Sequence, residues 1–98
     1  MFEIDFLPAA LDDIEQTKNW YNKKKENLGY EFVKEIEKII ELVILNPYSF
    51  AKKYKEMRQV KINRFPFFIS YIINDINVVV LSVLHTSCNP NEFTKRYK

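Results

Sequence analysis

Two apolar segments near the end of the chain constrain the fold most strongly. Residues 66–73 (PFFISYII) and 78–84 (VVVLSVL) are almost uninterrupted apolar runs, and Asn74-Asp75-Ile76-Asn77 separates them. Two such runs joined by a short polar turn predict a β-hairpin of two buried strands. Successive side chains of a strand point to opposite faces, so both faces of this hairpin are largely apolar. The hairpin therefore needs cover on both sides.

The beginning of the chain predicts one strand and a first helix. Residues 2–6 (FEIDF) alternate apolar and acidic side chains, which is the two-residue period of a half-buried strand. Pro8 suits the first turn of a helix, and Asp12 and Asp13 complement the positive end of its dipole. Apolar residues then recur at helical spacing, which predicts a helix over 8–26.

A second helix and one further strand complete the predicted pattern. Gly29 is the only glycine, and we assign it to a tight turn between the helices. Residues 30–45 carry a broad apolar stripe, which ends where Asn46 precedes Pro47. Residues 55–62 alternate with charged side chains and predict a strand. The order is β-α-α-β-β-β, an α+β fold in which a helical hairpin packs on one face of an antiparallel-dominated sheet.

Composition narrows the class of protein. With 98 residues, 47% of them hydrophobic, the chain has material for a single domain over 1–98. The lone Cys88 has no second thiol for a disulfide, and it lacks the further ligands of a structural metal site. No basic leader or membrane-length apolar run is present. We therefore expect a cytoplasmic protein without metal, cofactor or membrane contact.

Positive charge is concentrated in one segment, although the net charge is only +2. Residues 51–64 (AKKYKEMRQVKINR) contain six basic side chains against Glu56 alone. Such a segment attracts phosphate groups or an acidic protein partner. The alternative is a solvated strand edge that lysines protect from aggregation.

Several motifs in this order resemble the RelE/ParE superfamily, the toxins of type II toxin-antitoxin systems. The resemblance rests on NWYNKKKENLGYEFVKEI, NPYSF, MRQVKINRFPFFISYII and VVVLSVLHTSCNPNEFTKR, which together cover nearly the whole chain. It implies a plasmid-stabilisation type toxin that is neutralised by a cognate antitoxin protein. Members similar to RelE cut messenger RNA on the ribosome, whereas members similar to ParE inhibit DNA gyrase without cutting nucleic acid. The common fold leaves both targets open.

RNA cleavage needs groups that move protons and fixed cations that stabilise charge on the phosphate. By motif order, the resemblance implies a catalytic set of Arg58, Arg64 and His85. It also implies contacts to nucleic acid or a partner by Lys53, Lys55, Lys61, Tyr71, Asn89 and Arg96. An endoribonuclease would place Arg58 and His85 side by side in a concave basic site.

The tail of the chain departs from the family pattern. Relatives with this tail usually carry an arginine where Cys88 stands, so a cation beside His85 is missing. Cys88 is better interpreted as a small apolar filler. By strand parity His85 matches Val79, Leu81 and Val83, which also fits a residue that simply ends a strand. A gyrase inhibitor and a degenerate member that only binds a partner therefore remain alternatives to the nuclease.

Overall fold

The predicted hairpin forms the centre of a five-stranded sheet. The computed structural model describes residues 2–89. β4 (Phe67–Asn74) and β5 (Asn77–His85) pair antiparallel, and β1 (Glu3–Phe6) lies parallel to β5 on its other side. β3 (Met57–Lys61) and β2 (Lys52–Tyr54) extend the sheet in the order β1-β5-β4-β3-β2. The predicted α+β architecture is confirmed.

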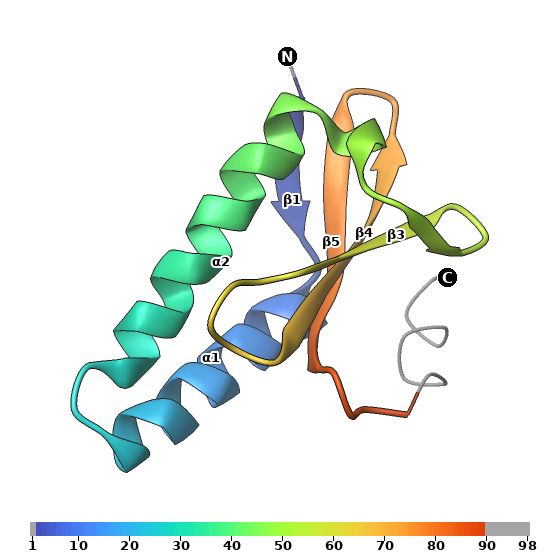
Figure 1. Cartoon of the computed structure of the whole chain (residues 1–98). Coiled ribbons are helices and arrows are strands. Elements are labelled where there is room, and N and C mark those ends of the chain that lie inside the picture. Colours follow the sequence, from blue (N-terminus) through green and yellow to red (C-terminus); the bar gives the residue numbers. More distant parts are fainter. Residues whose placement is uncertain (1, 90–98) are drawn as a thin grey trace.

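Two helices cover one face of this sheet, which we call the helix face (Figure 1). α1 (Pro8–Lys24) has proline at its first position, and α2 (Leu28–Leu45) ends directly before Asn46-Pro47, as the sequence indicates. A short 3-10 helix, η1 (Pro47–Ser49), then leads to β2. Apolar side chains of α2 and of the sheet meet in one core, which includes Phe32, Ile36, Val43, Ile69, Tyr71 and Val80.

The predicted role of Gly29 is wrong, because this residue lies inside α2 rather than in the turn. Asn27 takes the left-handed backbone conformation at the turn, with φ of 68°. Gly29 is buried where α2 crosses α1, and its N–H donates a 2.7 Å hydrogen bond to Oδ1 of Asn22. The first helix accordingly ends at Lys24, two residues before the predicted boundary. The only glycine serves close helix packing.

The predicted strand over 55–62 is also corrected at its start. Lys55 and Glu56 form a turn between β2 and β3, and Lys55 has φ of 51°. The basic segment is therefore a short antiparallel hairpin at the sheet edge instead of one strand. Alternation of charged and apolar residues did not distinguish a strand from two strands joined by a tight turn.

A β-bulge in β5 changes the face of the sheet on which the side chains at the end of this strand lie. β4 pairs first with Val80 and then with Ser82, so Leu81 is one residue extra on β5. Val80 and Val83 both pack in the helix-face core, whereas Leu81 packs on the opposite, second face. The expected parity of His85 with Val79 and Leu81 is therefore wrong, since His85 lies on the helix face with Val83.

Asp13 has a different role from the one predicted for it. β1 pairs with β5 only as far as Val80, so the following residues of β5 have a neighbouring strand, β4, on one side only. The Asp13 carboxylate accepts a 3.0 Å hydrogen bond from the Val83 N–H at this edge. Asp13 thus joins α1 to the sheet, and no acidic residue lies in the first turn of α1.

Candidate functional site

Arg58 holds the connection between α2 and β2 against the sheet. Its Nη1 atom donates hydrogen bonds to the carbonyl oxygens of Tyr48, at 3.1 Å, and Phe50, at 2.6 Å. The guanidinium group also lies 5.4 Å from the centre of the Tyr48 ring, within the range of a cation-π contact. These contacts give Arg58 a structural role.

Tyr71 is buried directly opposite Arg58 in the sheet register. Its hydroxyl donates a 2.7 Å hydrogen bond to the Pro47 carbonyl oxygen. Burial raises the pKa of Tyr71 to about 12, although the nearby Arg58 charge partly opposes this shift. A buried hydroxyl that stays protonated far above neutral pH is poorly suited to exchange protons with a substrate.

Tyr71→Phe is expected to lower the free energy of unfolding by about 1–2 kcal/mol at pH 7, because the buried Pro47 carbonyl loses its donor. The folded-state pKa lies above the unfolded value of 10, so the wild type loses stability as pH rises through this range. The phenylalanine variant lacks that loss, and the stability difference between the two proteins should shrink above pH 10. Urea unfolding at pH 7–11 measures both effects.

The exposed Tyr30 provides a matched control for this substitution. Tyr30→Phe should change the free energy of unfolding by less than about 0.5 kcal/mol at any of these pH values. If the difference in free energy of unfolding between wild type and Tyr71→Phe stays constant up to pH 11, the expected effect of Tyr71 ionisation on stability is contradicted.

Arg64 anchors the connection between β3 and β4 to α2. It adopts φ of 70°, and its Nη2 atom lies 2.7 Å from Oε1 of Glu31. Nη1 lies 4.0 Å from the Glu35 carboxylate, which is almost completely buried. The hydrogen bond from Arg64 lowers the pKa of Glu31. Arg64 is therefore engaged with α2 and does not face Arg58.

His85 ends β5 with its ring against Phe67, the residue opposite it in the register. The two ring centres are 5.2 Å apart in an edge-to-face arrangement. Nδ1 of His85 accepts a 3.0 Å hydrogen bond from the Ser87 N–H and lies 2.7 Å from the Ser87 hydroxyl oxygen. A backbone N–H can only donate, so Nδ1 carries no proton while this bond exists.

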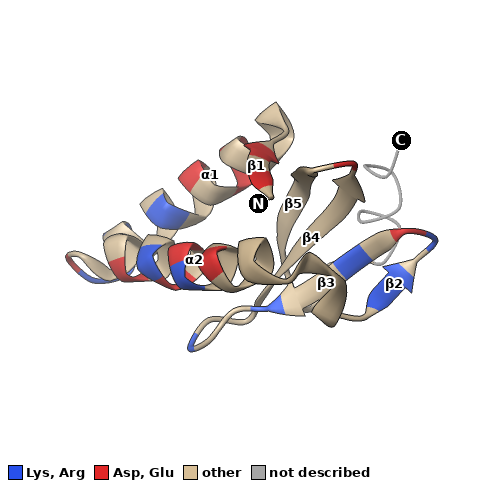
Figure 2. Cartoon of the chain, turned by 90° about the horizontal axis from the view of Figure 1, so that it is seen from above, with Lys and Arg blue, Asp and Glu red and all other residues tan. Residues whose placement is uncertain are grey.

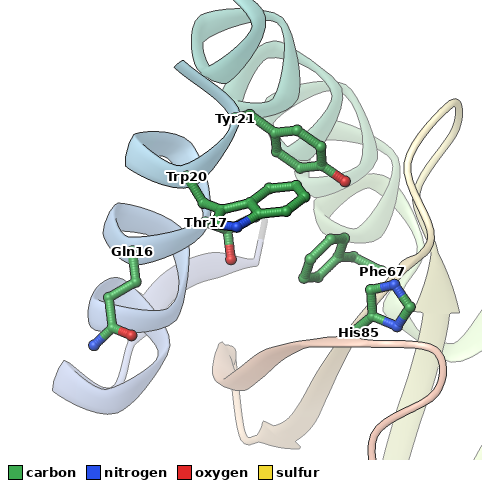
Figure 3. Close-up of a pocket in the computed structure, with 6 residues that line it drawn as sticks. All are labelled: Gln16, Thr17, Trp20, Tyr21, Phe67 and His85. Atoms are coloured by element: carbon green, nitrogen blue, oxygen red, sulfur yellow. The ribbon is translucent and has the colours of Figure 1, made fainter. Parts of the chain in front are cut away.

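A cavity of about 440 Å³ lies between α1 and the ends of β4 and β5. Figure 3 shows its lining side chains, which are Gln16, Thr17, Trp20, Tyr21, Phe67 and His85. Tyr21 packs in the core against Phe65 and Phe67. Trp20 is 54% exposed, so its indole forms one wall of an open cavity. The lining is mainly aromatic, and within residues 2–89 no Lys or Arg side chain contributes to it.

Arg58 and His85 do not form one site. Both lie on the helix face, but Arg58 is opposite Tyr71 and His85 is opposite Phe67. These partners are four residues apart on β4, which corresponds to about 13 Å along the strand. The fully buried Ile69 lies between them on the same face. The expected concave basic site with both residues side by side is absent from residues 2–89.

Exposed basic residues of the segment 51–64 lie on β2, in the following turn and on β3, away from the helices (Figure 2). We call Lys52, Lys53 and Lys55 the lysine tip. Lys52 forms a 3.1 Å ion pair with Glu56, and the Lys55 ammonium lies 5.3 Å from the Tyr54 ring centre. The tip is exposed to solvent over all three residues.

The other residues implied by the resemblance are dispersed. Lys61 is exposed, and its ammonium donates to the Ile62 and Phe65 carbonyl oxygens. Asn89 is exposed at the end of the described chain, and Arg96 lies outside the described residues. Of these predicted residues, Lys53 and Lys55 are the two that lie close together within the described part of the chain.

The second face of the sheet carries a smaller apolar cluster. Met57 and Leu81 are buried there, and Cys88 packs against them. Cys88 thus has the environment of an apolar filler. A polar row crosses the same face, where Nε2 of Gln59 donates to the Ser70 hydroxyl at 3.1 Å and Ser82 lies opposite Ser70. The cover that the sequence requires on this face would come from the C-terminal segment or from a partner, and residues 90–98 lie outside the described part of the chain.

The described residues contain no group of three or more His, Cys, Asp and Glu side chains placed to bind a metal ion. None of the helices within residues 2–89 combines the length and apolar character needed to cross a membrane.

The fold is similar to that of two solved toxins. A structure titled as the chromosomal ParDE toxin-antitoxin system of P. aeruginosa matches with a TM-score of 0.76 at 13% identity, covering 87% of this chain and 96% of that one. The isolated E. coli RelE toxin matches with a TM-score of 0.66 at 18% identity over the full length of both chains. No curated protein sequence matches the chain. At these identities the two structures establish the fold and leave the target open.

The sequence itself identifies the family. Residues 4–90 match the family model described as the ParE toxin of the type II toxin-antitoxin system parDE. The match spans β1 to the end of β5 and includes both helices. Membership implies an antitoxin partner. The chain therefore belongs to the ParE toxin family of type II toxin-antitoxin systems.

Proposed function

We propose that the protein is a cytoplasmic growth-inhibiting toxin that acts by binding DNA gyrase, without cleaving nucleic acid. The observation that carries this proposal is the separation of Arg58, Arg64 and His85, each of which has its own structural contacts. A nuclease requires proton carriers and cations around one phosphate group. The ParE family match favours the same function.

The lysine tip supplies the contact with the target. Lys53 lies on β2 and Lys55 in the turn that follows it, and both are exposed. This edge of the sheet lies away from the two helices (Figure 2). Exposed cations of this kind steer association with an acidic surface and contribute to specificity. The antitoxin offsets the same charges with acidic side chains and covers the second face of the sheet.

Expression of the protein alone in a bacterial host, with DNA supercoiling and transcript ends followed during growth, tests the proposal. We expect growth arrest, inhibited supercoiling and unchanged transcript ends. His85→Ala should retain the arrest, because the contacts of His85 with Phe67 and Ser87 give it a structural role at the end of β5. Lys53→Glu/Lys55→Glu should raise the concentration that half-inhibits purified gyrase by about tenfold or more.

Lys23→Glu/Lys34→Glu is the matched control, since it makes the same charge change at exposed positions on the helices. This control should leave gyrase inhibition within about twofold of the wild type. New transcript ends that disappear in His85→Ala would instead make the protein a ribonuclease. Absence of growth arrest would identify a member that only binds its partner.

A further inference from the structure

An open groove runs between the two helices at the sheet edge opposite the lysine tip. Its volume is about 580 Å³, and its apolar lining consists of Phe6, Leu11, Ile14, Val33, Ile36 and Ile40. Phe6 belongs to β1, which is one edge strand of the sheet, and the lysine tip begins on β2, the other edge strand. Leu11 is 54% exposed. We call this feature the α1–α2 groove.

Two carboxylates line the same groove. Glu37 and Glu41 are four residues apart on α2, so they lie on one side of the helix. Among the described residues, neither carboxylate has an ion-pair partner. Two neighbouring cations have other partners, because Lys38 on α2 pairs with Glu35 at 3.4 Å and Lys18 on α1 pairs with Glu15 at 3.3 Å. The groove therefore combines an apolar floor with uncompensated negative charge.

From these observations we propose that the α1–α2 groove binds a basic amphipathic helix of a partner protein. The negative charge of Glu37 and Glu41 selects Lys or Arg beside the apolar stripe of the bound segment. This inference concerns a surface remote from the lysine tip and does not depend on the identity of the toxin target.

The walls of the groove explain why the bound segment is helical. All lining residues except Phe6 lie inside α1 or α2, where backbone groups are satisfied within each helix, so these walls offer an extended peptide no hydrogen-bond partners. A helix satisfies its own backbone and presents only side chains to the groove. The stretch from Val33 to Glu41 rises by about 12 Å, which corresponds to roughly two turns of a bound helix.

Three synthetic peptides of 18 residues test the proposal without a growth assay. The first has a leucine stripe at helical spacing flanked by lysines, the second replaces each lysine by glutamate, and the third is the basic peptide with a central proline. Calorimetry measures affinity for the full chain, and methyl NMR locates the contact. We expect the basic peptide to bind about tenfold or more tightly than the other two, with shifts at Leu11, Val33 and Ile40.

Charge reversal in the protein supplies the second arm of the test. Glu37→Lys and Glu41→Lys should each weaken binding of the basic peptide by about two- to tenfold and strengthen binding of the acidic one. Glu26→Lys is the control, because Glu26 is exposed between the helices and away from the groove lining. It should change either affinity by less than about twofold.

Three results would overturn the proposal. Equal affinity for the basic and acidic peptides would remove the role of the two carboxylates. Undiminished binding of the proline peptide would indicate an extended occupant. Concentration-dependent shifts of the same methyl groups without any peptide would assign the groove to a second copy of this chain.

Discussion

Replacing Gly29 by alanine is expected to destabilise the protein by about 2–3 kcal/mol, although alanine normally favours helices. A Cβ atom at this position would overlap the backbone oxygen of Lys18 and lie 2.7 Å from Cγ of Asn22. The Asn22 side chain can move, but the Lys18 oxygen belongs to the backbone of α1. The helices must therefore separate, and the overpacking cost exceeds the roughly 1 kcal/mol gain in helix propensity.

Thermal and urea unfolding of Gly29→Ala measure this effect. For a chain of this length, a loss of 2–3 kcal/mol corresponds to a decrease in Tm of about 10–20 °C. Lys34→Ala is the control, because it tests an exposed position of the same helix and should change stability by less than about 0.5 kcal/mol. A stabilised Gly29→Ala protein would show that the helix crossing tolerates a methyl group.

Phe32→Ala is expected to have the largest effect, a loss of about 3–5 kcal/mol in the free energy of unfolding. Phe32 is fully buried, and its ring lies 5.3–5.7 Å from the ring centres of Tyr21, Phe65 and Phe67. These three rings come from α1, the β3–β4 connection and β4. Removal of the Phe32 ring leaves a cavity between these three rings, where the helical hairpin meets the sheet.

Equilibrium urea unfolding followed by far-ultraviolet circular dichroism measures this loss. Because small domains are stable by only about 5–15 kcal/mol, the variant should be partly unfolded near 37 °C. Phe32→Leu should recover much of the stability, since leucine refills most of the cavity. A loss below about 1 kcal/mol for Phe32→Ala would mean that the neighbouring rings collapse into the space.

The elements themselves were predictable because hydrophobic periodicity and helix-stopping residues are local properties. The two apolar runs around Asn74–Asn77 form β4 and β5, and Pro8 and Asn46-Pro47 lie at the helix boundaries the sequence indicates. The family resemblance could also be recognised from the sequence, because its motifs are continuous stretches of residues. Each of these features depends on residues that are neighbours in the sequence, so it can be predicted without knowledge of the packing.

The positions of the candidate site residues depended on long-range contacts that local patterns do not encode. One extra residue, Leu81, turns His85 from the second face to the helix face, and a bulge has no signal in the alternation of apolar residues. Arg58 and Arg64 look like free cations in the sequence. Their partners, Phe50 and Glu31, become neighbours only after the chain folds.

The sequence by itself thus determined the order of the elements, the apolar core segments and the toxin family. Hydrophobic periodicity, proline positions and continuous motifs each involve only residues that are close together in the sequence. Only the tertiary structure decided that Gly29 serves a helix crossing, that Arg58 and His85 lie apart, and that a negatively charged groove opens between α1 and α2. The physical reason is that side-chain neighbours are set by strand register and helix packing, which a bulge or a close contact changes without altering the local pattern.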